Sequence, residues 1–283
     1  MFYTVRVNPP SLPARSNVAP QRVAAIIPAH NVGHDVAGTV RACRAIPGVD
    51  LLIVVDDGSD DNTGAAARAA GAVVVRHSVE RGRASAIETG VKVAAMRDRA
   101  DWPARLLLVL NADLGDSAVE ATALVESVMN GEADCACSIP IGMSLTSKLG
   151  RAAQLARRVI RRATGWEPAY PLASVRCVTR EGITAAMPFM NGYGLEIAMT
   201  IDVLNAGLSI IEIPCSFERT GADKSFGDLN PRTRFTDTTI ASIRTVFGRA
   251  KARRHHPHLY ANARQGVGIP YPCVARDREL TDA

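Results

Sequence analysis

Short apolar runs alternate with alanine-rich stretches of helical periodicity along the first half of the chain. Each run is brief and mostly uncharged, which is typical of strands buried on both faces of a sheet. We therefore predict strands at 22–29, 51–57, 72–76, 105–110 and 133–139. The intervening stretches predict helices at 35–45, from about 63 onward, at 82–97 and at 118–129. Regular strand–helix alternation of this kind predicts an α/β fold with a mostly parallel twisted sheet and helices on both faces.

The pattern changes after residue 140, where the alternation becomes less regular. The elements predicted there are a basic helix at 145–164, a strand at 173–179, helices at 181–186 and 195–205, a strand at 208–214 and a last helix at 233–249. We expect the domain to consist of two halves, 22–139 and 140–250. The proline-rich residues 1–21 predict a flexible leader without the apolar core of a signal peptide, and 251–283 predict a loose basic tail.

Composition narrows the class of protein. The 283 residues carry a net charge of +5, and the segment from Lys148 to Arg162 holds six basic residues and no acid. Such a stretch suits an anionic ligand, a membrane surface or nucleic acid. We do not expect nucleic acid, because aromatic residues make up only 5% of the chain and no recognition motif is present. The six cysteines form no CxxC pair, which favours reduced thiols and a cytoplasmic location.

Polar residues follow three of the predicted strands at the point where each strand ends. His-Asn follows the first strand, Asp-Asp-Gly-Ser-Asp-Asp the second and Asn-Ala-Asp the fourth. The carboxyl ends of parallel strands are where such sheets bind ligands. A carboxylate pair after one strand and an Asp-x-Asp-like turn after another can hold Mg²⁺ or Mn²⁺ against a diphosphate.

These segments resemble a known family. The stretches AAIIPAHN (24–31), IVVDDGSDDNT (53–63), RGRASAIETG (81–90) and LVLNADLGDS (108–117) resemble, in order and spacing, the nucleotide-binding half of family 2 glycosyltransferases with the GT-A fold. The later stretch from Gly192 to Phe217 looks like the corresponding segment of dolichyl-phosphate sugar transferases and of glucosyl-3-phosphoglycerate synthase. The resemblance implies that 22–139 binds a nucleotide sugar and that 140–250 holds an acceptor.

The resemblance also implies roles for individual residues. The positions that would contact the nucleotide are Pro28, Ala29, His30, Asp56, Asp57, Gly82, Arg83, Asn111 and Ala112. Asp113 would bind the metal and so be required for catalysis, with Glu218 as a further metal ligand. Glu196 would face the acceptor as a catalytic base or an orienting group.

Three positions depart from the family's usual pattern. Val32 stands where relatives have a glutamate, Asn111 replaces the first acid of the metal-binding turn, and Glu218 stands where some relatives have a histidine. An amide at 111 can still contact the ribose or a metal-bound water, and Glu218 keeps an oxygen ligand that suits Mg²⁺. The departures leave an alternative open: a degenerate GT-A protein that binds a nucleotide without turnover.

Simpler structural roles compete with the functional ones. Asp56, Asp57 and Asp61 can stabilise turns or cap the helix from 63, as can Asn62. Glu196 can be a helix N-terminal acid favoured by the macrodipole. Asn111 can satisfy backbone groups at a strand end.

The basic helix at 145–164 has three interpretations. Small and apolar residues share one side and five arginines, Arg151, Arg157, Arg158, Arg161 and Arg162, share the other. This pattern is typical of a surface helix on a core, of a helix that docks on anionic lipid, or of one that binds an anionic acceptor.

We therefore predict a metal-dependent glycosyltransferase that moves a sugar from a nucleotide donor, UDP-linked in preference to GDP-linked, to an unidentified acceptor. The basic helix leaves an anionic or lipid-linked acceptor open as one option, and peripheral contact at the inner face of the membrane is an alternative to a purely cytoplasmic location. A homodimer is a further alternative that the sequence leaves open.

Overall fold

The computed structural model describes residues 20–147 and 149–218. The leader predicted at 1–21 lies almost wholly outside the described residues. The helix predicted at 233–249 and the tail at 251–283 lie entirely outside them.

A seven-stranded sheet forms the centre of the fold, with the order β3-β2-β1-β4-β6-β5-β7. The strands are β1 Val23–Ala29, β2 Val49–Asp56, β3 Val73–Arg76, β4 Leu106–Val109, β5 Cys135–Pro140, β6 Arg176–Val178 and β7 Ile210–Cys215. β1, β2, β3 and β4 pair in parallel, as do β5 and β7, whereas β6 runs antiparallel to both of its neighbours. The prediction of a mostly parallel sheet is confirmed, and β6 is the exception.

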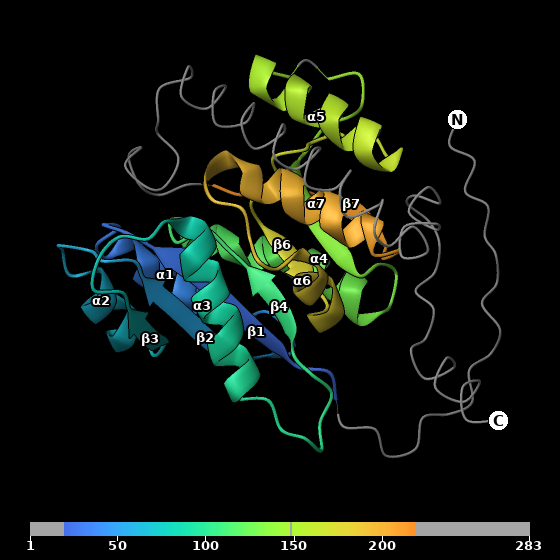
Figure 1. The fold of residues 1–283 in the computed structure, drawn as a ribbon. Helices are drawn as coiled ribbons and strands as arrows, with labels where there is room; N and C mark the ends of the chain where they lie inside the picture. The colour runs from blue at the N-terminus through green and yellow to red at the C-terminus, as the bar shows by residue number, and fades with distance from the viewer. Residues whose placement is uncertain (1–19, 148, 219–283) are drawn as a thin grey trace.

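Helices cover both faces of this sheet (Figure 1). They are α1 Asp35–Cys43, α2 Thr63–Ala69, α3 Arg83–Met96, α4 Thr122–Met129, α5 Arg151–Thr164, α6 Arg180–Ala186 and α7 Leu195–Asn205, with 3₁₀ turns η1 Gly115–Ala121 and η2 Gly192–Gly194. One core contains buried residues of α1, α2 and α4, and the other contains those of α3, α6 and α7. Gly90 lets α3 approach β1, because an added Cβ would overlap the side chain of Ile26.

The basic helix begins later than predicted. α5 starts at Arg151 rather than at 145, after Gly150 in an extended conformation with ψ 160°. Residues ahead of it form a hydroxyl-rich turn in which the Ser144 N–H donates to Ser147 Oγ at 2.9 Å. This alternative hydrogen bonding competes with a helix, as serine side chains often do. α5 buries Ala156 and Ile160 against Ile197 and Ile201 of α7.

Other element boundaries differ less. The helix predicted at 118–129 divides into η1 and α4, and the strand predicted at 173–179 forms ladder bonds only over Arg176–Val178. Cys135 and Cys137 lie on one face of β5, as predicted, with their sulfur atoms 3.7 Å apart. None of the helices in the described part of the chain has the length and apolar character needed to cross a bilayer.

Candidate active site

The loops at the carboxyl ends of β1 to β4 form one connected surface, which we call the carboxyl edge: residues 28–33, 56–63, 77–83 and 111–117. The loop after β1 is bonded to the turn after β2. The Asn31 N–H donates to Ser59 Oγ at 3.0 Å, and Asn31 Oδ1 accepts from the Asp60 N–H at 2.9 Å. Asn31 has a φ of 50°, a left-handed conformation that asparagine tolerates better than most residues.

Asp61 completes this connection from the β2 side. Its carboxylate accepts from the Gly33 N–H and from the Thr63 N–H, each at 2.9 Å. Partial burial would raise the pKa of Asp61, but the hydrogen bonds from Thr63 and Gly33 outweigh it, so the pKa lies below the usual value. Asp61 therefore acts as the helix-capping acid that the sequence predicted, although Asn62 occupies the formal cap position of α2.

Asp56 is buried at the end of β2, with 2% of its surface exposed. Its Oδ1 accepts from the Ser59 N–H at 3.0 Å, and its Oδ2 lies 3.8 Å from Arg76 Nε. Gly64 leaves room for this carboxylate, because an added Cβ would come within 2.7 Å of Asp56 Oδ2. These contacts describe an acid that stabilises the turn between β2 and α2.

Asp57 is completely buried and holds the loop that precedes α3. Its Oδ1 lies 2.6 Å from His77 Nδ1 and accepts from the Arg81 N–H at 2.9 Å, while its Oδ2 accepts from the Gly82 N–H at 2.7 Å. Both carboxylate oxygens are thus bonded within the protein. Asp57 fixes the backbone from which Arg83 projects.

His30 and His77 both belong to this network. Asp57 O lies 2.8 Å from His30 Nδ1, and His77 Nε2 lies 2.9 Å from Thr89 Oγ1. His30 was predicted from the sequence, whereas His77 was not. The available signal for His77 was its position directly after the apolar run at 72–76, where the third strand ends at the same edge as Asp57.

Arg83 connects three distant segments of the chain. Its Nη1 donates to Asn111 Oδ1 at 2.8 Å, its Nη2 donates to Ser174 O at 2.8 Å, and its Nε lies 3.7 Å from Glu196 Oε1. The Arg83 and Glu196 side chains are 17% and 12% exposed. The structure therefore brings together three residues that the sequence predicted separately, from the start of α3, the end of β4 and the first turn of α7.

Asn111 uses both ends of its amide. Its Oδ1 accepts from Arg83, and its Nδ2 donates to Ser174 Oγ at 3.0 Å. Ser174 was not predicted from the sequence, because it lies in an irregular segment before β6 with no motif around it. Asn111 in this arrangement is a bridge between the two halves of the domain.

The turn that carries Ala112 and Asp113 is anchored to α1. The Thr39 hydroxyl donates to Ala112 O at 2.8 Å and accepts from the Gly115 N–H at 2.9 Å. Gly38 packs closely here, since an added Cβ would lie 3.3 Å from Gly115 Cα. The backbone on both sides of Asp113 is therefore fixed, and Asp113 itself is only 2% exposed.

Glu218 reaches the same turn through its backbone. Its N–H donates to Ser117 Oγ at 2.9 Å, and its carbonyl accepts from that hydroxyl at 2.9 Å. The segment after β7 thus lies against the turn that follows Asp113. Across the described ranges, no three His, Cys, Asp or Glu side chains gather as a complete metal shell. Val32, where relatives have an acid, packs against the hydrophobic core instead.

Comparisons with known proteins agree with this fold. The crystal structure of glucosyl-3-phosphoglycerate synthase from Mycobacterium tuberculosis with Mn²⁺, UDP and glucosyl-3-phosphoglycerate has a TM-score of 0.59 at 23% identity, covering 81% of this chain and 80% of that one. The structure of the same enzyme with Mg²⁺ and UDP has a TM-score of 0.60 at 24% identity, covering 81% and 79%. Likeness at these identities establishes the shared GT-A fold.

No curated protein matches the chain significantly in sequence. A family model described as glycosyl transferase family 2 matches residues 24–197, which is more than half of the chain and includes the four motifs of the carboxyl edge. The protein therefore belongs to glycosyl transferase family 2, and its enzyme class is that of a glycosyltransferase.

Proposed function

We propose that the protein transfers a sugar from a nucleotide donor, a UDP-sugar in preference to a GDP-sugar, in a reaction that depends on Mg²⁺ or Mn²⁺. The observation that carries the proposal is the convergence of Arg83, Asn111 and Glu196 beside the turn that bears Asp113. A guanidinium suited to phosphate and a buried carboxylate suited to a cation lie at the edge where such sheets bind ligands.

Arg83 is the proposed partner of the donor's diphosphate. A guanidinium offers a planar fork of donors that matches phosphate oxygens. Arg83 begins α3, and the first N–H groups of a helix have no acceptor within the helix. The positive end of the helix dipole adds to the attraction for an anion at this place.

The residues at the Asp113 turn fit a hard divalent cation. Asp113 offers a buried carboxylate, and Glu218, on a segment bonded to the same turn, would be a second oxygen ligand. We propose that the donor phosphates and water supply the remaining ligands, as is usual for Mg²⁺. When bound, the cation neutralises the negative charge that develops on the departing diphosphate.

The nucleoside is proposed to lie at the end of β1, against Pro28, Ala29 and His30. We assign Asp57 the task of fixing the loop that leads to Arg83, because both of its carboxylate oxygens are already bonded there. The preference for uridine is supported by the UDP bound in the two similar crystal structures.

Glu196 is proposed to orient Arg83 and the acceptor. Its carboxylate lies 3.7 Å from Arg83 Nε, and its backbone carbonyl accepts from the buried Arg176 at 3.1 Å. The second half of the domain, which Glu196 belongs to, would hold the acceptor. We propose an anionic or lipid-linked acceptor, reached in the cytoplasm or at the inner face of the membrane, because α5 adds five arginines to this half.

A thermal-shift panel tests the donor site: UDP and GDP, each with and without Mn²⁺. A ligand that binds only the native state stabilises it by about 2.7 kcal/mol at 100 times its Kd. We expect UDP with Mn²⁺ to raise the Tm more than UDP alone, Mn²⁺ alone or GDP with Mn²⁺. A larger shift with GDP and Mn²⁺ would indicate a GDP-sugar donor and would still support the metal site. The absence of any shift with either nucleotide would contradict the proposal.

A further inference from the structure

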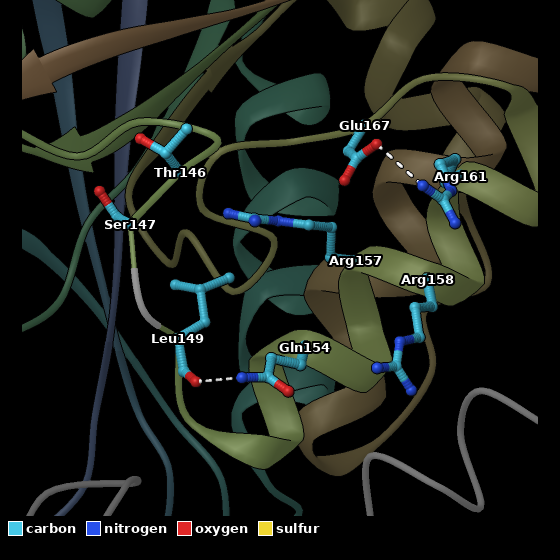
Figure 2. A pocket seen from close by; sticks show the side chains of 8 residues that line it. All are labelled: Thr146, Ser147, Leu149, Gln154, Arg157, Arg158, Arg161 and Glu167. Atoms are coloured by element: carbon cyan, nitrogen blue, oxygen red, sulfur yellow. Dashed lines mark hydrogen bonds and ion pairs between the residues drawn. The ribbon is translucent and has the colours of Figure 1, made fainter.

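A basic pocket of about 310 Å³ lies between α5 and the segments directly before and after it (Figure 2), and no residue of the carboxyl edge lines it. We call it the α5 pocket. Arg157, Arg158 and Arg161 line it from the helix, and the side chains of Thr146, Ser147 and Gln154 add hydroxyl and amide groups. In Figure 1, α5 is stacked on α7 and lies away from β1, β2 and β3.

The charge of the α5 pocket is strongly unbalanced. Among the described residues, Glu167 is the one acid that lines it, and its Oε2 lies 3.2 Å from Arg161 Nη1. The Arg158 side chain makes no hydrogen bond or ion pair to another residue in the described part of the chain. Three guanidinium groups within five consecutive residues of a helix repel one another, and like charges at i and i+4 destabilise a helix. A bound anion would remove this repulsion.

The walls of the α5 pocket are already fixed. Arg157 donates from Nη1 to Leu145 O at 2.8 Å and from Nη2 to Ala169 O at 2.6 Å, which joins the segments before and after the helix. Gln154 Nε2 donates to Leu149 O at 2.8 Å. A site that is formed before its ligand arrives loses less conformational entropy on binding.

We propose that the α5 pocket binds the phosphate group of a phosphorylated molecule. Arginine forks match phosphate oxygens, and charge-assisted hydrogen bonds from them are stronger than neutral ones. The volume lies at the lower end of the range of roughly 300–1,000 Å³ for small-molecule sites, enough for a phosphate and a small organic part. The proposal does not rest on sugar transfer, because binding can be measured without a nucleotide sugar.

Two sources of this phosphate are compatible with the pocket, a free phosphorylated molecule and a lipid headgroup. The lipid source gains support from Ile141 and Leu145, which are 70% and 54% exposed in the segment that forms one wall. Apolar side chains beside a basic surface are typical of contact with an anionic lipid layer.

The test uses two matched variants of the full-length protein. Arg158→Gln removes a charge inside the α5 pocket, and Arg162→Gln removes a charge on an exposed residue of the same helix outside it. Binding of inorganic phosphate is measured by calorimetry at low ionic strength. Sedimentation is measured with phosphatidylcholine vesicles that contain or lack phosphatidylglycerol. Neither side chain makes a hydrogen bond or ion pair within the described ranges, so both variants are expected to keep the wild-type Tm.

We expect Arg158→Gln to weaken binding roughly tenfold, as the loss of one hydrogen bond to a charged group would. Arg162→Gln should change it less than about twofold. Binding of inorganic phosphate would indicate a free phosphorylated ligand. Binding only to vesicles that contain phosphatidylglycerol would indicate a lipid headgroup. Either result supports the proposal if Arg158→Gln weakens binding more than Arg162→Gln does. Equal losses in the two variants would indicate diffuse surface charge and overturn it. Failure of both probes to bind would overturn it too.

Arg83→Gln separates the α5 pocket from the carboxyl edge. If the phosphate binds at α5, Arg158→Gln weakens phosphate binding by the same factor in the wild-type protein and in the Arg83→Gln variant. If phosphate binding is lost in Arg83→Gln and kept in Arg158→Gln, the anion binds at the carboxyl edge and the proposal fails. The thermal-shift test of the donor site does not depend on this result, so the α5 proposal can fail while the proposed function holds.

Discussion

The carboxyl edge and α5 are both rich in charge, but their charged side chains are held in different ways. At the carboxyl edge, Asp57 bonds with three neighbouring groups and Arg83 joins three segments. On α5, the side chains of Arg158 and Arg162 make no hydrogen bond or ion pair to another residue in the ranges that the structure describes, and four buried residues there form the core between α5 and α7.

This difference indicates two kinds of binding surface. Side chains that already bond one another lose little entropy when a ligand arrives, which suits the close placement that catalysis requires. Unbonded arginines at a surface attract anions but impose less geometry on them. Substitutions at the carboxyl edge should therefore reduce both stability and ligand binding, whereas substitution of Arg158 on α5 should affect binding alone.

Among substitutions of the side chains that surround Asp113, we expect Arg83→Gln to have the largest effect on UDP affinity. It removes the guanidinium proposed for the diphosphate, and hydrogen bonds to charged groups are worth about 1.5–3 kcal/mol. We expect UDP affinity, measured by calorimetry with Mn²⁺, to fall roughly tenfold to a hundredfold. Arg81→Gln, two positions earlier and exposed, is the matched control and should keep wild-type affinity. Equal UDP affinity in Arg83→Gln and wild type would show that Arg83 does not bind the donor.

Asp57→Asn should reduce stability without any ligand present. An amide nitrogen in place of Oδ2 would face the Gly82 N–H, so one buried donor loses its acceptor at a cost of about 1–3 kcal/mol. Thermal unfolding of the free protein should show a Tm lower by several degrees. Asp60→Asn, in the same turn but exposed, should change stability by less than about 0.5 kcal/mol. Identical Tm values for both variants would mean that the loop is not held by Asp57.

Asn111→Asp has the smallest expected effect. A carboxylate can still accept from Arg83, and the Ser174 hydroxyl can reverse and donate to it. We expect turnover within roughly tenfold of wild type, about 1.4 kcal/mol of barrier. A large gain from a silent wild type would instead favour the degenerate alternative, in which Asn111 has cost the protein its activity.

The sequence predicted the carboxyl edge better than the start of α5, because periodicity locates strand ends but does not reveal a turn that side chains stabilise. Strand ends and their polar residues follow from periodicity, so the order of residues alone was enough to place Asp57 and Asn111 at one edge. Arg83 was predicted only from the resemblance to family 2 glycosyltransferases. Their mutual bonds could not be predicted in this way, because Ser174 and His77 enter through tertiary packing. The start of α5 was predicted too early because Ser144 and Ser147 bond each other in a turn that helical periodicity does not reveal.

The most direct test of the central claim is release of UDP from UDP-sugars by wild type, Asp113→Asn and Asp116→Asn in the presence of Mn²⁺. Asp116 lies in the same turn but is exposed, so Asp116→Asn controls for the loss of one acid there. We predict slow release by wild type, the same rate for Asp116→Asn, and a loss of more than about a hundredfold for Asp113→Asn, since metal-assisted charge neutralisation is worth several kcal/mol. Release that is unchanged in Asp113→Asn would contradict the account.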